Sequence, residues 1–215
     1  MARVWLTVLP TLLFLAGAAD SAPDLRRDQA LRSLTDTDVQ VRRQAALRLG
    51  EIGVMADGSA LRRALRDSDA STRENAEQAM WRIWERSGDR KVDQLYQAGV
   101  AQMNSGDVDG ALSTFTRIIE LKPGFAEGWN KRATLYFVAG DYRKSLADCA
   151  QVIKRNPYHF GALAGYGQIY LRLEDYERSL EYFRRALQVN PNMDSVRLNI
   201  QLLEELIAQR LRNMI

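Results

Sequence analysis

Apolar residues recur at helical spacing along most of the chain, and in its C-terminal half the same arrangement returns three times. Pro123, Pro157 and Pro191 stand 34 residues apart. A fixed period of this length predicts a repeat architecture of antiparallel helical pairs, because one pair cannot bury its apolar face alone. Counting back from each proline gives three units of matching pattern, at residues 92–125, 126–159 and 160–193.

Small residues are expected where the two helices of a pair approach each other most closely. The first helices carry Gly99, Ala133 and Gly167 at equal positions, and the second helices carry Ala111, Ser145 and Ser179. Gly-Asp at 106–107 and 140–141 and Glu-Asp at 174–175 predict a turn and a helix start, because aspartate caps the next helix. Each proline is expected to end a second helix, because the residue before a proline disfavours the helical conformation.

This arrangement of large apolar, small, aromatic and proline residues resembles the tetratricopeptide repeat. The matching residues are Leu95, Ala98, Gly99, Ala111, Phe115 and Pro123 in the first unit, Trp129, Ala133, Tyr136 and Pro157 in the second, and Leu163, Gly167, Tyr170, Phe183, Ala186 and Pro191 in the third. The resemblance implies a right-handed superhelix whose concave wall is built by the first helix of each pair. Residues 127–148 look like those of small exported bacterial tetratricopeptide proteins, a likeness that extends over 92–193.

A second period, of 31 residues, runs through residues 24–86. It superposes Leu34 on Leu65, Asp36 on Asp67, Asp38 on Asp69, Arg42 on Arg73, Ala45 on Ala76 and Ile52 on Ile83. The stretch LTDTDVQVRRQAALRLGEIG resembles a short HEAT-type repeat, in which the aspartates of a turn cap the next helix and pair with an arginine. We expect two such repeats, packed onto the first tetratricopeptide unit through the short link 87–91.

The C-terminal residues 194–214 predict one further amphipathic helix. Its apolar positions include Val196, Leu198, Leu202, Leu203 and Leu206. Terminal repeats expose a face that needs covering, so we expect this helix to cap the third unit. The alternative is that its apolar stripe is a seam through which the chain forms a homo-oligomer. Together these elements predict an all-α solenoid of two HEAT-like repeats, three tetratricopeptide repeats and a capping helix.

Residues 1–19 have the pattern of a secretory signal peptide. Arg3 is the only charge, the run from Val4 to Leu15 is almost wholly apolar, and Ala16-Gly17-Ala18 supplies small residues for cleavage. The run is also short for a membrane span, which needs about 20 residues. We expect an exported protein, periplasmic in a bacterium; secretion or a retained N-terminal anchor are the alternatives.

The composition offers little material for catalysis. One histidine, His159, and one cysteine, Cys149, cannot make a zinc site of the usual kind, and no disulfide can form within the chain. Cys149 stands where Phe115 and Phe183 stand in the neighbouring units, which predicts a small core residue; a reactive thiol is the alternative. We therefore expect a protein that is not an enzyme and needs no metal or cofactor.

Charge also limits the class of partner. Lys and Arg number 30 against 27 Asp and Glu, a balance that argues against a nucleic-acid surface. The aspartates at 36, 38, 67 and 69 could form carboxylate pairs or calcium ligands, but their recurrence at equal positions favours helix capping. We expect a protein or peptide partner.

The family resemblance implies that such a partner binds in the concave groove. The outward positions of the first helices are Tyr96, Val100, Met103 and Asn104, then Asn130, Lys131, Thr134 and Phe137, then Ala164, Gln168, Leu171 and Arg172. An apolar floor with a few amides suits an extended peptide or a helix. The alternative is that Met103, Phe137 and Leu171 only pack between repeats. We predict a scaffold or adaptor for protein contacts, or alternatively an assembly subunit that oligomerises through the C-terminal helix.

One subgroup of the family grips the C-terminal carboxylate of chaperones with basic and asparagine residues. The corresponding positions here hold Tyr96, Val100 and Gly165, and Lys131 stands where an asparagine is needed, with Asn130 displaced by one. This carboxylate clamp is therefore not expected, and neither is binding of chaperone tails.

Overall fold

The computed structural model describes residues 25–213, and every regular element in this range is a helix. The N-terminal unit comprises α1 (Arg27–Ser33), α2 (Val39–Ile52), the 3-10 helix η1 (Met55–Asp57), α3 (Gly58–Ala64) and α4 (Ala70–Trp84). The repeat pairs are α5 (Arg90–Ser105) with α6 (Val108–Leu121), α7 (Ala126–Val138) with α8 (Tyr142–Arg155), and α9 (Phe160–Arg172) with α10 (Tyr176–Val189). Helix α11 (Asp194–Asn213) follows. The predicted all-α solenoid is confirmed, whereas the predicted signal peptide lies outside the described residues.

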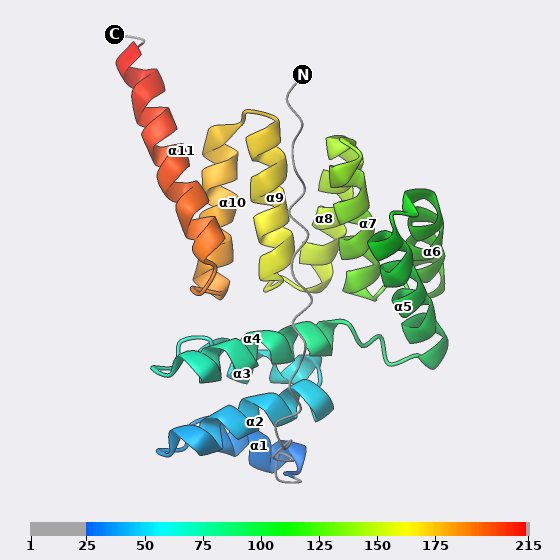
Figure 1. The fold of residues 1–215 in the computed structure, drawn as a ribbon, viewed down its shortest axis with the longest axis vertical. Coiled ribbons are helices and arrows are strands. Elements are labelled where there is room, and N and C mark those ends of the chain that lie inside the picture. Colours follow the sequence, from blue (N-terminus) through cyan, green and yellow to red (C-terminus); the bar gives the residue numbers. More distant parts are fainter. Residues whose placement is uncertain (1–24, 214–215) are drawn as a thin grey trace.

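The three pairs stand side by side, and α11 lies along the outer face of α10 (Figure 1). The aspartates predicted to start the second helices do so: Asp107, Asp141 and Asp175 each accept a hydrogen bond from the backbone N–H of the third residue of α6, α8 and α10. Gly106 and Gly140 adopt left-handed φ angles of 80° and 77° before them, a conformation that favours glycine. The Gly-Asp pattern therefore accounts for the first two turns, whereas in the third turn Glu174 adopts the left-handed conformation, with a φ of 57°.

Close approach within the pairs is as the small residues predict. A Cβ atom on Gly99 would lie 2.7 Å from Cζ of Phe115, and one on Gly167 would lie 2.4 Å from Cδ1 of Phe183. Each phenylalanine is fully buried. In the third pair the hydroxyl of Ser179 also donates a hydrogen bond of 2.8 Å to the carbonyl of Gly167. In the first and third pairs, a phenylalanine ring of the second helix thus packs directly on the backbone of a glycine in the first helix.

Aspartates also begin the helices of the N-terminal unit, where Asp38 and Asp69 cap α2 and α4. The expected pairing of the turn aspartates with arginine, however, runs between the two repeats. Arg42 makes a 2.7 Å ion pair with Asp67, and the guanidinium of Arg43, hydrogen-bonded to Asp69, holds the pKa of that carboxyl well below its usual range. These charges therefore hold α2 against the turn before α4. Whether the two copies are HEAT repeats stays a prediction.

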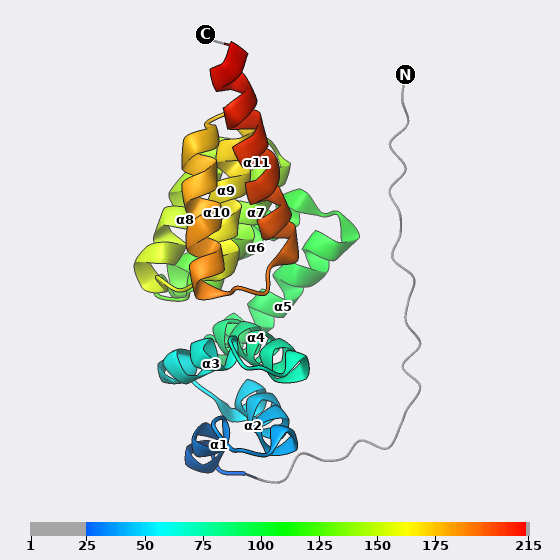
Figure 2. The same cartoon turned by 90° about the vertical axis from the view of Figure 1, so that its left-hand side faces the viewer.

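The N-terminal unit does not simply continue the stack from the first pair, as the sequence suggested. Its helices run across the lower ends of the repeat helices (Figures 1 and 2). Phe160, at the start of α9, belongs to the same buried cluster as Trp84, and the side-chain amide of Asn192 donates a 2.8 Å hydrogen bond to the carbonyl of Leu65. Part of the expected contact with the first pair is present at the end of α4, where the hydroxyl of Tyr96 donates a hydrogen bond of 3.0 Å to Glu85. The unit thus docks mainly on the third pair and the start of α11.

Candidate functional site

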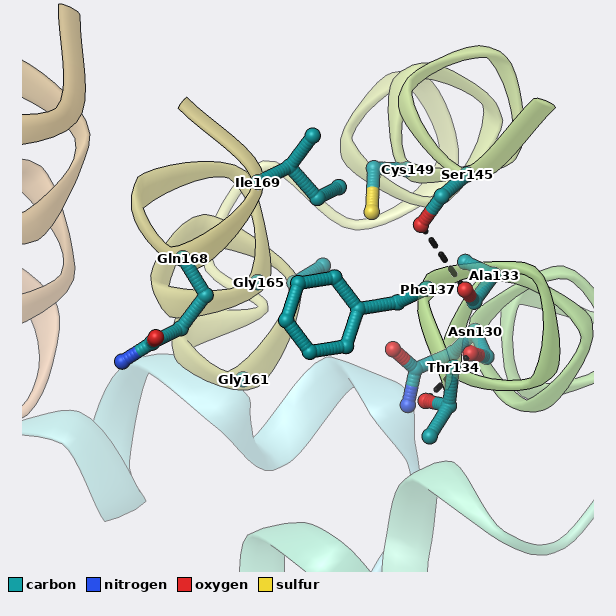
Figure 3. Close-up of a pocket in the computed structure, with 11 residues that line it drawn as sticks. Asn130, Ala133, Thr134, Phe137, Ser145, Cys149, Gly161, Gly165, Gln168 and Ile169 are labelled. Carbon is teal, nitrogen blue, oxygen red and sulfur yellow. Dashed lines mark hydrogen bonds between the residues drawn. The ribbon is translucent and has the colours of Figure 1, made fainter. Parts of the chain in front are cut away.

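A cavity of about 190 Å³ opens between the second and third pairs, on the side where their first helices face each other. Figure 3 shows the ring of Phe137 reaching from α7 towards Gly165 of α9, with Cys149 and Ile169 above it in this view. The lining residues come from α7 (Asn130, Ala133, Thr134, Phe137), α8 (Ser145, Cys149) and α9 (Gly161, Ala162, Gly165, Gln168, Ile169). Most of this lining is apolar.

The cavity coincides with a difference between the second unit and its neighbours. At the positions of Phe115 and Phe183 the second unit has Cys149, and opposite it Ala133 takes the place of a glycine. A thiol is much smaller than a phenyl ring, so the space filled by a ring in the other two pairs is incompletely filled here. The methyl group of Ala133 and the thiol of Cys149 both line the resulting cavity.

Four uncharged polar side chains border the cavity, and the hydroxyl of one of them, Ser145, donates a hydrogen bond of 2.8 Å to the carbonyl of Ala133. The hydroxyl of Thr134 is bound within its own helix, donating to the carbonyl of Asn130, and the Nδ2 of Asn130 donates to Glu127 at 2.9 Å. Within residues 25–213, the Oδ1 of Asn130 and the whole side-chain amide of Gln168 have no hydrogen-bond partner. One acceptor and one complete amide are therefore available to a ligand, without any charged group.

Cys149 is too well buried to act as a nucleophile. Its side chain is 3 % exposed, and burial, assisted by the nearby Asp148 carboxylate, raises the pKa of the thiol to about 12. At neutral pH the thiol therefore stays protonated, and only the thiolate is reactive. Cys149 shapes the cavity and does not supply chemistry to it.

Four of the predicted groove residues meet at the cavity, namely Asn130, Thr134, Phe137 and Gln168. The prediction for Tyr96 is wrong, because this residue is 1 % exposed and its hydroxyl donates to Glu85 at 3.0 Å. Lys131 is also engaged, 3.7 Å from the same carboxylate. The repeat pattern, which predicts both residues on the groove face, carries no signal for the end of α4, where Glu85 contacts both of them.

The remaining predicted residues lie away from the cavity. Val100 and Met103 pack against the buried cluster of the first pair, and Leu171 and Ala164 pack against that of the third. For Met103 and Leu171 this matches the packing alternative. Asn104 and Arg172 are exposed beyond them. Of the predicted groove residues, only those between α7 and α9 therefore line this cavity.

A buried polar cluster, which we call the hub, lies beneath this site. His159 and Glu127 are both fully buried, and the Nε2 of the imidazole lies 2.5 Å from the Oε1 of the carboxylate. The Nδ1 accepts the backbone N–H of Ala162 at 3.0 Å, so the hydrogen is on Nε2 and is donated to Glu127. Trp84 stacks on the imidazole with ring centroids 4.4 Å apart. The hub thus joins the starts of α7 and α9 to the N-terminal unit.

The environment of Glu127 favours its ionised form. Burial alone would raise its pKa, but the interaction with His159, the hydrogen bond from Asn130 and the nearby Lys131 ammonium hold the pKa below its ordinary value. The role of His159 as the cap of α9 and partner of Glu127 was not found from the sequence. A signal was present, because one histidine beside the start of a repeat helix stands 32 residues after a glutamate at the start of another.

Neither a metal site nor a membrane span is found in the part of the chain that the structure describes. Among residues 25–213, no three His, Cys, Asp or Glu side chains are placed to hold a metal ion. The helices within this same range also lack the length and apolar character of a transmembrane segment. Trp81 packs against Gly161, one of the residues that line the cavity: a Cβ atom on this glycine would lie 2.5 Å from Cη2 of the indole ring.

Comparison with known sequences is informative over the repeats. The family model of the tetratricopeptide repeat matches residues 96–142 and 130–194. A TPR repeat-containing protein of Rhizobium etli is 34% identical over 125 residues, which are 58% of this chain and 61% of that protein. The small glutamine-rich tetratricopeptide repeat-containing protein of Dictyostelium discoideum is 28% identical over 117 residues, 54% of this chain and 35% of that protein. The chain therefore spans less than two thirds of the length of these relatives.

Solved structures share the fold. The Sgt2 TPR domain from Aspergillus fumigatus superposes with a TM-score of 0.54 at 19% identity, covering 58% of this chain and 83% of that one. The first TPR of Spaghetti bound to an HSP90 peptide gives a TM-score of 0.54 at 20% identity, with 55% and 94% covered. MamA gives 0.52 at 17% identity, with 65% and 80% covered. At these identities the likeness is one of fold.

Proposed function

We propose that the protein is a non-enzymatic scaffold that binds a peptide or helix of a partner protein between α7 and α9, because the tetratricopeptide family model matches residues 96–194. The observation that carries the proposal is the cavity, whose lining is mostly apolar and which is bordered by the unbonded Oδ1 of Asn130 and the unbonded side-chain amide of Gln168. Such a site holds one apolar side chain of the ligand, while Asn130 and Gln168 bind main-chain groups beside it. We place the scaffold in the bacterial periplasm, on the pattern of residues 1–19.

The proposed ligand differs from a chaperone tail. One structural neighbour is described as bound to an HSP90 peptide, SRMEEVD, which is rich in carboxylates. The side chains that line this cavity are all uncharged. We therefore propose an apolar anchor residue and main-chain recognition, and no carboxylate clamp.

Filling the cavity tests this function. The double substitution Ala133→Gly with Cys149→Phe restores the glycine and phenylalanine pair of the other two units, so the fold is expected to persist while the cavity closes. In crosslinking and pull-down from envelope extracts of the native host, a specific partner should be lost from this variant and from Phe137→Ala with Gln168→Ala. Val138→Ala is the control, because Val138 is 73% exposed and is not among the cavity residues. Equal partner recovery from all variants would contradict the proposal.

A second candidate function, self-assembly, is favoured by the outer face of α11. The inner face of α11 is buried through Val196, Ile200 and Leu203. On the outer face, Leu198 and Leu202 are 55% and 54% exposed and lie one turn apart. In this alternative, the two leucines form the contact between two copies of the chain. Sedimentation of Leu198→Lys with Leu202→Lys tests it, because these changes leave the capping face intact. We expect a shift to monomer if the protein assembles, and an unchanged sedimentation coefficient excludes this seam.

A further inference from the structure

Some arginines of the N-terminal unit form ion pairs with carboxylates, whereas others, such as Arg73 and Arg86, bond to backbone carbonyls. Arg27, Arg42 and Arg43 are paired with Asp57, Asp67 and Asp69, and Arg32 is paired with Asp28. Arg62, Arg63 and Arg66 of α3 and the following turn, in contrast, have no carboxylate partner among residues 25–213. Unpaired arginines this close together repel one another, so a cluster of this kind costs free energy unless an anion binds to it.

These three residues line a recess of about 480 Å³, which we call the arginine trough. Its other walls are Ser59, Tyr158 at the turn before α9, and the end of α10 at Gln188 and Val189. No aspartate or glutamate within residues 25–213 lines it. The trough therefore presents hydrogen-bond donors and positive charge in a concave surface, and it lies outside the groove between α7 and α9.

The three guanidinium groups are not equally free. Arg66 donates to the carbonyls of Gln188 and Val189, the last residues of α10, so it has a structural role in docking the N-terminal unit. Arg62 stacks on Tyr158, with its Cζ 3.3 Å from the ring centroid, and its Nε is buried without a hydrogen-bond partner in the described part of the chain. Arg63 is exposed. A buried donor left unpaired is costly, and a bound acceptor is the usual remedy.

From these contacts we infer that the arginine trough is a second docking site, which takes an acidic segment of a protein partner through aspartate or glutamate side chains. Guanidinium groups bind carboxylates in pairs of parallel hydrogen bonds, and stacking on Tyr158 holds Arg62 in a fixed orientation for this contact. A recess between two helical layers admits single side chains, whereas a flat lipid surface reaches only its rim. The near balance of 30 basic and 27 acidic residues supplies no general attraction for polyanions.

The test uses the full chain and a fluorescent decapeptide rich in glutamate, with the corresponding glutamine peptide as the uncharged probe. By fluorescence anisotropy we expect the acidic peptide alone to bind, and Arg62→Gln with Arg63→Gln to weaken it by about tenfold or more. Arg66 is left intact because it holds α10. Arg143→Gln, which removes an exposed arginine from α8, is the control and is expected to leave the affinity unchanged. Thermal unfolding of each variant verifies that it is folded.

Several results would overturn the inference. These are absence of binding, equal binding of both peptides, an equal loss in Arg143→Gln, or binding of inorganic phosphate or anionic vesicles but not of the peptide. Phe137→Ala with Gln168→Ala should still bind the acidic peptide, because these residues line a different cavity. Failure of the trough is thus distinguishable from failure of the groove.

Discussion

Replacing Glu127 with alanine is expected to lower the free energy of unfolding by about 3 to 5 kcal/mol, the range for removing one member of a buried hydrogen-bonded pair. The change leaves the Nε2–H of His159 buried without an acceptor and releases the amide of Asn130. Because His159 also caps α9, the starts of two repeat helices lose their connection together. Denaturant titration followed by circular dichroism measures the loss.

Two substitutions make this prediction specific. Glu120→Ala removes an exposed carboxylate whose only ion pair within residues 25–213 is with Arg117, also on the surface, and should change stability by less than about 1 kcal/mol. Glu127→Gln keeps an oxygen that can accept from His159, so its loss should be smaller than that of alanine. If Glu127→Ala proved as mild as Glu120→Ala, the hub would contribute little to the fold.

Acid should act on the same group. The pKa of Glu127 is lower in the folded protein than in the unfolded chain, so its contribution to stability is complete above the ordinary carboxyl pKa and is lost as the pH falls through the folded value. The free energy of unfolding of Glu127→Ala should therefore fall less steeply between neutral and acidic pH than that of the unmodified protein. Parallel curves would show that other carboxylates dominate acid unfolding.

Truncation of Trp84 should produce the second large effect, a loss of about 3 to 5 kcal/mol. The indole is 6% exposed, stacks on His159, and lies with its ring centroid 5.0 Å from that of Phe160. Since these contacts join the N-terminal unit to the third pair, Trp84→Ala should also expose the link 87–91. Limited proteolysis should then cut near Gly88 faster than in the unmodified chain.

A tryptophan outside this junction provides the control. Trp129 bonds to the carbonyl of Pro123 and stacks with Arg155 on the repeat surface. Trp129→Ala should cost less stability and leave cleavage near Gly88 unchanged. If Trp84→Ala left the link as resistant as before, the docking of the N-terminal unit would depend on other contacts.

The repeats could be predicted from the sequence because their rules are local. A proline every 34 residues, a small residue facing an aromatic ring, and an aspartate before each second helix all act within one unit. Gly167 and Phe183, for example, are only 16 positions apart and meet as the pattern requires. The sequence period therefore matches the packing of each pair, and the turns between the helices follow from it.

The junction could not be predicted in this way because its contacts join distant segments without a shared period. Trp84 and His159 are 75 positions apart, and Leu65 and Asn192 are 127 apart. Tyr96 was therefore assigned to the groove, although α4 ends over it. The cavity had a clearer signal, because Cys149 at a phenylalanine position implies missing volume, yet the size of the remaining space depends on how α9 packs beside it.

The transverse placement of the N-terminal unit has a mechanical consequence. A solenoid in which each helical hairpin contacts only its neighbours can bend along its length, because no contacts connect distant hairpins. Here the N-terminal unit contacts the start of α9 through Trp84 and the start of α11 through Asn192. Within the described range, its one side-chain hydrogen bond to the first pair is made by Glu85. We therefore expect the two later hairpins to keep a fixed curvature, and the first hairpin to move more freely against them.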